Sequence, residues 1–268
     1  MSLSNQDWHL RYTRQARWTK SLRDHLFRLS GLDQAQRVLE VGCGTGVLLA
    51  EIAVTSTRNI HGLDIDLERL QLAASHAPGT QLACGDANWL PYKSETLGGC
   101  FCHYLLLWVN EPAAVLSEMV RVTRPGGAVL ILAEPDYGGR IDYPPDLEVL
   151  GERQIAALRR QGANPEMGRR LAGILANSGL VQVEVGVLGG EWKEPPDQEA
   201  LQSEWAVYMS DFEYLGERNA VRDSLFALQE IDRSAWESGE RVLYVPTFYA
   251  WGRVPAAANP DLKPVRFT

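Results

Sequence analysis

The stretch RVLEVGCGTGVLLAEIA, residues 37–53, decides the fold. Within it, an apolar run reaches three glycines at alternate positions, Gly42, Gly44 and Gly46, and an apolar segment then resumes. This pattern is typical of a β-strand, a tight loop and an α-helix. Glycine-rich loops between a strand and a helix let a bound nucleotide approach the backbone, so the stretch predicts a nucleotide site.

Strand-like and helix-like segments alternate in the residues that follow this loop. Further strands are predicted at 59–65, 80–86, 97–106 and 128–135, and helices at 67–77 and 112–122. A last strand is predicted at 241–254, where Pro246 favours a sheet edge or a bulge. Such alternation is typical of a parallel sheet that is covered by helices on both faces. Ligands of these sheets bind beyond the carboxyl ends of the strands, so functional side chains are expected where each strand ends.

Acidic residues stand at or near the ends of the first three predicted strands: Glu40, Asp64 and Asp86. A carboxylate after the second strand is suited to accept hydrogen bonds from ribose hydroxyls, and one after the third to accept one from an exocyclic amine. No lysine follows the glycines, which excludes a phosphate-binding P-loop. The spacing G-x-G-x-G also differs from the dinucleotide pattern G-x-G-x-x-G, because the third glycine comes one residue early.

Four motifs in order, VLEVGCGTG, GLDID, GDANWLPY and VRVTRPGGAVLI, resemble the S-adenosylmethionine-dependent methyltransferases of the seven-stranded, Rossmann-like class. Within that class they look closest to small-molecule enzymes such as those of quinone biosynthesis. The resemblance covers residues 36–135 closely and continues loosely to the last strand. It implies an α/β three-layer sandwich with a mostly parallel seven-stranded sheet whose last strand is antiparallel. It also implies methyl transfer from S-adenosyl-L-methionine to a small-molecule acceptor by in-line displacement, with S-adenosyl-L-homocysteine as the product.

The resemblance also assigns cofactor-binding roles to individual residues. These are Glu40, Gly42, Cys43, Gly44 and Gly46 for the methionine part, Asp64 for the ribose, Ile65, Asp86 and Ala87 for the adenine, and Cys102 and His103 beside the sulfonium. One departure is Leu97-Gly98, where the family often has Phe-Asp, and we interpret it as a structural variation.

Candidate catalytic residues follow the fourth and fifth strands. His103 titrates near neutral pH, Glu134 ends the fifth strand, and Tyr137 lies in the glycine-rich segment after it. Each has a structural alternative: a packed histidine, a carboxylate that ties down the next loop, and a tyrosine that only covers the sheet. Because the methyl group of the cofactor is already activated, a base is needed only where the nucleophile arrives protonated.

Residues 1–30 are predicted to form an N-terminal helical lid. Tyr12, Gln15 and Trp18 recur in it at intervals of three, which places them near one face of the helix. The resemblance implies that this face closes over the cofactor. The alternative is that the aromatic residues only pack the helix onto the sheet.

Residues 31–268 are predicted to form the methyltransferase domain, with helical insertions at about 136–165 and 196–238 that surround the acceptor. Aromatic and other apolar residues recur at near-helical spacing in the second insertion, a pattern that more often marks a core than a pocket: Trp205, Tyr208, Met209, Phe212 and Tyr214. If they line a pocket instead, an aromatic or apolar acceptor is favoured.

The charge and the cysteines of the chain limit its partners and location. With 26 Lys and Arg against 34 Asp and Glu, the formal net charge is −8, which disfavours nucleic acid as a partner. The four cysteines form no paired metal-ligand pattern, so we expect no metal and reduced thiols in a cytoplasmic protein. No apolar run approaches the length of a membrane span.

The sequence leaves open alternatives to a small-molecule methyltransferase. Intact motifs are compatible with a non-catalytic protein that binds S-adenosylmethionine or S-adenosylhomocysteine. An NAD-dependent oxidoreductase is disfavoured by the early third glycine and by Asp86. A nucleic-acid methyltransferase is disfavoured by the acidic charge and by CHYLLLW, residues 102–108, which stands where an Asn/Asp-Pro-Pro-Tyr motif is expected. The sequence predicts neither the acceptor nor the oligomeric state.

Overall fold

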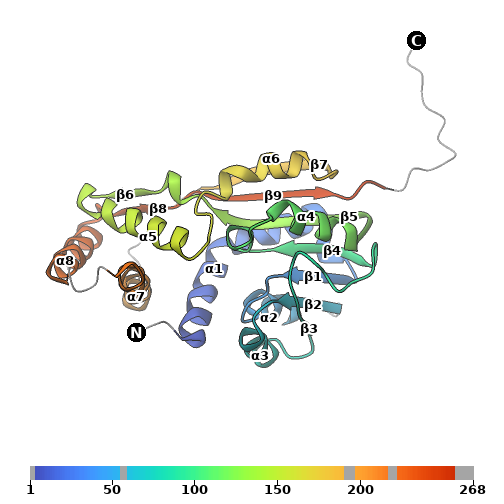
Figure 1. Ribbon diagram of the computed structural model, residues 1–268, viewed down its shortest axis with the longest axis horizontal. Helices are drawn as coiled ribbons and strands as arrows, with labels where there is room; N and C mark the ends of the chain where they lie inside the picture. Colours follow the sequence, from blue (N-terminus) through green and yellow to red (C-terminus); the bar gives the residue numbers. More distant parts are fainter. Residues whose placement is uncertain (1–3, 55–58, 190–196, 217–221, 257–268) are drawn as a thin grey trace, which may run out of the picture.

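A seven-stranded sheet forms the centre of the computed structural model, which describes residues 4–54, 59–189, 197–216 and 222–256 (Figure 1). The strand order is β3-β2-β1-β4-β5-β9-β7. The bounds are β1 Arg37–Val41, β2 Asn59–Asp64, β3 Gln81–Cys84, β4 Leu97–Cys102, β5 Thr123–Pro135, β7 Val181–Leu188 and β9 Thr247–Arg253. Strands β1 to β5 are parallel, and β9 runs antiparallel to both β5 and β7. The expected fold class is therefore confirmed.

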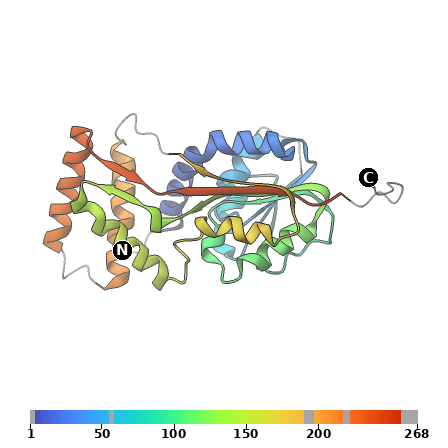
Figure 2. The same cartoon turned by 90° about the horizontal axis from the view of Figure 1, so that it is seen from above.

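Helices cover both faces of the sheet, as Figure 2 shows. Their bounds are α1 Asn5–Ser30, α2 Val47–Val54 and α3 Leu67–His76 on one face, and α4 Pro112–Val122 and α6 Leu171–Ala176 on the other. From Ala128 to Pro135, every residue of β5 is buried. A parallel strand covered on both faces needs such an unbroken apolar run, which explains the segment AVLILA at 128–133.

Helix α1 is long enough to serve two regions. A capping box starts it, because the side chains of Ser4 and Asp7 exchange hydrogen bonds with each other's backbone N–H groups. Its C-terminal half packs on the sheet through Leu26 and through Phe27, whose ring lies 5.4 Å from that of Phe101. Its N-terminal half extends past the sheet, where Arg11 pairs with Glu204. Of the expected lid, residues 1–3 lie outside the described part.

The remaining elements form a helical unit beside the sheet, at the left of Figure 1. Its members are α5 Glu148–Arg160, α7 Gln198–Leu215, α8 Arg222–Ser238 and the two-stranded sheet of β6 Ile141–Tyr143 and β8 Val242–Tyr244. The unit has a core of its own, made of Leu147, Leu150, Trp205, Tyr208, Phe212 and Leu225. The expected insertion 196–238 falls largely within it, although residues 196 and 217–221 lie outside the described part.

The predicted single strand at 241–254 is in fact two strands in two sheets. β8 pairs with β6 in the helical unit, and β9 pairs with β5 and β7 in the main sheet. Pro246 separates them, because proline cannot donate a hydrogen bond to a strand ladder. This segment therefore connects the helical unit to the main sheet.

No helix in the described ranges is long and apolar enough to cross a membrane.

Candidate cofactor and acceptor site

The glycine loop after β1 has a left-handed backbone at all three glycines, with φ of 73° at Gly42, 51° at Gly44 and 79° at Gly46. A β-carbon on Gly46 would lie 2.9 Å from Ala73 of α3, so this glycine allows loop and helix to pack. A β-carbon on Gly44 would meet only the ring of Tyr12, at 3.8 Å. Gly46 therefore serves packing, and Gly44 keeps the loop surface open.

Asp64 joins the end of β2 to this loop. Its Oδ2 accepts a hydrogen bond from the backbone N–H of Gly44 at 2.7 Å, and its Oδ1 accepts one from Asp66 at 2.9 Å. The carboxylate is 8% exposed, whereas the next side chain, Ile65, is 72% exposed. The predicted ribose and adenine residues thus lie side by side, one held in place and one facing solvent.

Glu40 lies under the loop and is buried. Its Oε2 has no hydrogen-bond partner among the described residues. Burial raises the pKa of this carboxyl above its usual range, against the opposing effect of the Arg23 guanidinium. A buried oxygen without a partner costs free energy, which a ligand with a hydrogen-bond donor would recover.

The loop after β3 presents Asp86 and a second residue of the motif GDANWLPY, Asn88, for which no role was predicted. Asp86 is exposed and accepts hydrogen bonds from the backbone N–H and the Nδ2 of Asn88, at 2.8 and 2.9 Å. Ala87 is buried between them. The Oδ1 of Asn88 is buried and lacks a partner within the described residues. This orphan oxygen was not detectable from sequence, since it depends on the turn that Asp86 forms.

Cys102 and His103 stand at the end of β4. Cys102 is fully buried, and burial raises the pKa of its thiol. The Nε2 of His103 lies 3.0 Å from Oγ1 of Thr19 on α1. Burial, together with the charge of Arg23, lowers the pKa of His103 to about 3, so the ring is neutral near pH 7. With that pKa it is a weak base, and its catalytic role stays a prediction.

Glu134 lies at the end of β5 with both carboxylate oxygens occupied. Oε1 accepts from the backbone N–H groups of Leu105 and Leu106, and Oε2 from that of Leu107, at 2.7–3.1 Å. Burial raises its pKa to about 8, although the three N–H donors favour the charged form. These contacts match the structural alternative, a carboxylate that ties down the loop after β4. Its catalytic role stays a prediction.

Helix α1 covers the glycine loop with Tyr12 but not with all the residues predicted for the lid. Gln15 is half-buried, and Trp18 is 65% exposed. Each step of three residues turns about 60° short of a full helical revolution, so two steps carry Trp18 away from the face of Tyr12. No role was predicted for His9, but its Nδ1 lies 2.9 Å from Oγ1 of Thr45 in the glycine loop. The His9 ring also stacks on His76 of α3, with centroids 3.7 Å apart.

Tyr137 lies between the cofactor side and the helical unit. It is half-buried, and its backbone N–H donates to the carbonyl of Pro165 at 2.8 Å. Burial raises the pKa of its phenol, and the charge of Arg11 opposes this effect. Arg11 in turn donates to Oε2 of Glu204 on α7 at 2.9 Å. Tyr137 is thus a neutral phenol near pH 7 beside an ion pair that joins α1 to α7.

The aromatic residues of the second insertion mostly pack within the helical unit. Trp205, Tyr208 and Phe212 are buried in its core and Met209 packs against it, whereas Tyr214 is 47% exposed. These rings therefore hold the unit together and give no support for an apolar acceptor.

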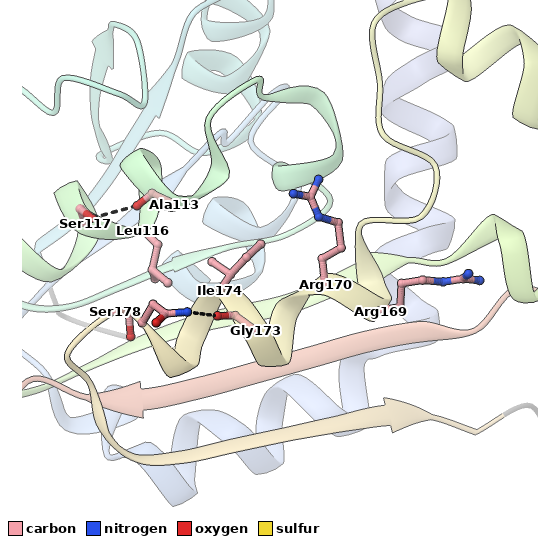
Figure 3. A pocket seen from close by; sticks show the side chains of 9 residues that line it. Ala113, Leu116, Ser117, Arg169, Arg170, Gly173, Ile174 and Ser178 are labelled. Atoms are coloured by element: carbon pink, nitrogen blue, oxygen red, sulfur yellow. Dashed lines mark hydrogen bonds between the residues drawn. The ribbon is translucent and has the colours of Figure 1, made fainter.

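A hollow of about 470 Å³ lies between α4 and α6, where Leu116 and Ile174 face each other (Figure 3). None of the predicted site residues lines it. Across the described ranges, no group of three or more His, Cys, Asp or Glu side chains is placed to hold a metal ion.

Comparisons with known proteins point to one class of domain. Residues 39–131 match the family model described as a methyltransferase domain. The demethylmenaquinone methyltransferase of Renibacterium salmoninarum is 32% identical over 152 residues, which cover 56% of this chain and 61% of that protein. The malonyl-[acyl-carrier protein] O-methyltransferase of Yersinia pestis is 33% identical over 93 residues, which cover 35% of this chain and 34% of that protein.

The chain thus spans about six-tenths of the length of the first of these relatives and about one-third of the length of the second. A solved structure, phosphoethanolamine N-methyltransferase 2 of Haemonchus contortus in complex with S-adenosyl-L-methionine, superposes with a TM-score of 0.53 at 17% identity. The match covers 82% of this chain and 49% of that one, and it shows a shared fold.

Proposed function

Because the chain carries a class I, S-adenosylmethionine-dependent type of methyltransferase domain, we propose that the protein transfers a methyl group from S-adenosyl-L-methionine to a small-molecule acceptor. S-adenosyl-L-homocysteine is the second product. The observation that carries the proposal is the arrangement at the glycine loop. Asp64 is hydrogen-bonded to this open loop, and the buried Oε2 of Glu40, two residues before its first glycine, has no hydrogen-bond partner among the described residues.

The residues at the strand ends fit this cofactor. Gly42, Gly44 and Gly46 hold a loop that a β-carbon would distort, and Asp64 supplies a fixed carboxylate for ribose hydroxyls. The orphan oxygens of Glu40 and Asn88 are acceptors, which suit the amino group of the methionine part and the exocyclic amine of adenine. Neither oxygen suits a phosphate group, which offers acceptors instead of donors.

The cofactor supplies a methyl group that is already activated by its sulfonium. The task of this chain is then to bind both reactants, align them and exclude water. Tyr12 lies over the glycine loop, and the His9–Thr45 contact fastens the N-terminal half of α1 there. His103 and Tyr104 occupy the end of β4, where the neutral imidazole is held by Thr19 and adds no positive charge beside a cationic cofactor.

Methyl transfer is tested with S-adenosyl-L-methionine labelled in its methyl group. The protein is incubated with three separate pools: a small-molecule extract, a protein fraction and nucleic acid. We expect label in the small-molecule pool, together with release of S-adenosyl-L-homocysteine. Label confined to protein or nucleic acid would contradict the acceptor class. Tight cofactor binding with no labelled product in any pool would support a non-catalytic binding protein.

We further propose a cytoplasmic location and no nucleic-acid partner. All four cysteines are free thiols, with Cys43, Cys100 and Cys102 buried, which supports a reducing compartment. The net charge of −8 supports the absence of a nucleic-acid partner. Cell fractionation checks the first proposal, and the nucleic-acid arm of the labelling experiment checks the second.

A further inference from the structure

The helical unit contains a chain of buried charges that the proposed cofactor site does not use. Asp142 of β6 accepts hydrogen bonds from Arg140 at 3.1 Å and from Arg241 at 2.9 Å. Arg241 also donates to Asp232 of α8 at 2.7 Å, and Asp232 accepts from the indole of Trp205 at 2.8 Å. All these ionic side chains are nearly inaccessible to solvent.

The network continues toward α1 through α7. Arg140 donates to the hydroxyl of Tyr208 at 2.8 Å, and the Tyr208 hydroxyl is hydrogen-bonded to Glu204. Glu204 pairs with Arg11 of α1. The cluster thus holds three guanidinium groups and, up to this point, three carboxylates: Arg11, Arg140 and Arg241 with Asp142, Glu204 and Asp232.

Asp211 of α7 is the fourth carboxylate of this cluster, and when it is ionised the cluster has one negative charge in excess. It is 7% exposed, and its Oδ2 has no hydrogen-bond partner among the described residues. The side chain of Gln154 on α5 hydrogen-bonds to it, and within the described chain no ion pair involves it. Desolvation raises the pKa of Asp211 to about 7, and the nearby charge of Arg11 opposes that rise.

Asp211 lies on the same face of α7 as Glu204 and Tyr208, because the three residues stand at positions i, i+4 and i+7 of that helix. On this face Glu204 pairs with Arg11 of α1, and the charge of Arg11 also acts on the carboxyl of Asp211 and on the phenol of Tyr137, lowering the pKa of each. Arg11 precedes Tyr12, whose ring lies over Gly44. Two neighbouring residues of α1 therefore contact the two regions: Tyr12 the proposed donor site and Arg11 the buried cluster.

We propose that Asp211 is the acceptor-binding residue and that the acceptor carries a protonated amine, which pairs with the orphan Oδ2. The inference rests on the proposed methyl transfer. A protonated amine supplies both what Oδ2 lacks, a hydrogen-bond donor, and the single positive charge that balances the cluster. A hydroxyl supplies only the donor. A carboxylate supplies neither and would add a second uncompensated negative charge.

Binding of matched probes tests this proposal without knowledge of the natural acceptor. The probes are ethylamine, benzylamine and 2-phenylethylamine, each compared with the alcohol and the carboxylate of the same skeleton. Ligand-observed NMR at about pH 7.5 measures their affinities for the full chain, with and without S-adenosyl-L-homocysteine. We expect at least one amine to bind about tenfold or more tightly than its alcohol and its carboxylate, a preference equal to one modest ion-pair contact. Equal binding of the three, or preference for the carboxylate, would overturn the proposal.

Two variants assign the preference to Asp211. Asp211→Asn keeps the shape of the side chain and removes its charge, and we expect it to abolish the preference for amines while S-adenosyl-L-homocysteine still binds. Glu199→Gln removes a charge from an exposed position on the same helix and should leave the preference intact. A preference that survives Asp211→Asn would overturn the assignment. Failure of the wild-type protein to bind S-adenosyl-L-homocysteine would instead contradict the proposed function, because amine binding is also measured without it.

Discussion

The carboxylate of Asp64 accepts a hydrogen bond from the backbone N–H of Gly44 at 2.7 Å, so one side chain joins the end of β2 to the glycine loop after β1. The same carboxylate is bonded to the backbone N–H of Asp66. The loop and the proposed ribose-binding group are therefore fixed relative to each other before any ligand binds. Such preorganisation reduces the entropy lost when a ligand is ordered.

Asp64→Asn is expected to weaken binding of S-adenosyl-L-homocysteine by about tenfold or more. The amide removes the charge and one acceptor oxygen, and a hydrogen bond to a charged group contributes about 1.5–3 kcal/mol. Calorimetric titration measures the change. Glu68→Gln, an exposed acid in the first turn of α3, serves as the control and should bind like the wild type. An unchanged Kd in Asp64→Asn would refute the role of this carboxylate.

Alanine at two glycines of the loop is expected to separate packing from ligand binding. In Gly46→Ala, the new methyl group meets Ala73 at 2.9 Å and the left-handed backbone is strained, so the free energy of unfolding should fall by about 2 kcal/mol or more. In Gly44→Ala only the strain applies, so the loss should be about 1 kcal/mol, while affinity for S-adenosyl-L-homocysteine falls. Urea unfolding and calorimetry measure the two effects. Equal stability losses would contradict this division.

Asp142→Asn is expected to lower the free energy of unfolding by about 3–5 kcal/mol, because it leaves two buried guanidinium groups without their shared carboxylate. Glu230→Gln breaks a solvent-exposed pair with Arg233 and should change the free energy of unfolding far less, because solvent screens that pair. Urea unfolding of both variants checks the contrast. If the two losses are alike, the buried network does not stabilise the helical unit.

Asp211→Asn is expected to raise the thermal midpoint, and to raise it more at about pH 8 than at about pH 5. Burial raises the pKa of Asp211 from its ordinary value of 3.8 to about 7 in the folded state. Stability linked to this group is therefore complete below about pH 3.8 and is lost progressively as the pH rises to about 7, because the unfolded chain ionises before the buried carboxyl does. The amide does not ionise. A midpoint difference independent of pH would show that Asp211 does not titrate in this environment.

Acid is expected to loosen the N-terminal half of α1. Burial and the nearby His76 ring lower the pKa of His9, so the His9 contact is fully present above its ordinary value of 6.5 and is lost as the pH falls. Hydrogen exchange of residues 5–16 at about pH 7.5 and 5.5 measures the effect. His9→Gln can still bond to Thr45 but does not titrate, and its exchange should change less with pH. Identical pH dependence in the two proteins would exclude His9 as the cause.

The sequence was sufficient to predict the sheet because its decisive features are local. The glycine spacing at 42–46, the apolar run of β5 and the acids at the strand ends each follow from a few adjacent residues. The antiparallel last strand came from the family resemblance. The division of residues 241–254 into two strands was not predicted. Pro246 favoured a sheet edge or a bulge within one strand, and only the pairing of β8 with β6 shows that the segment enters two sheets.

The roles of individual side chains were harder to predict from the sequence, because they depend on contacts between residues that are far apart in the chain. Glu134 looked equally suited to chemistry and to loop support until its three backbone donors, about 28 residues away in sequence, were located. His9 and Asp211 gave no signal at all in the sequence. Trp18 is largely exposed and lies away from the face of Tyr12, because residues three apart drift around a helix, so its role in the lid stays a prediction.

The most direct measurement is a calorimetric titration of the wild-type protein with S-adenosyl-L-homocysteine and, separately, with NAD. Both ligands carry an adenosine group, but only the first carries an amino-acid part with a free amino group, which is what the buried Glu40 oxygen lacks. We predict micromolar or tighter binding of S-adenosyl-L-homocysteine and no measurable binding of NAD. Tight binding of NAD with no response to S-adenosyl-L-homocysteine would contradict the assignment of this protein as a methyltransferase.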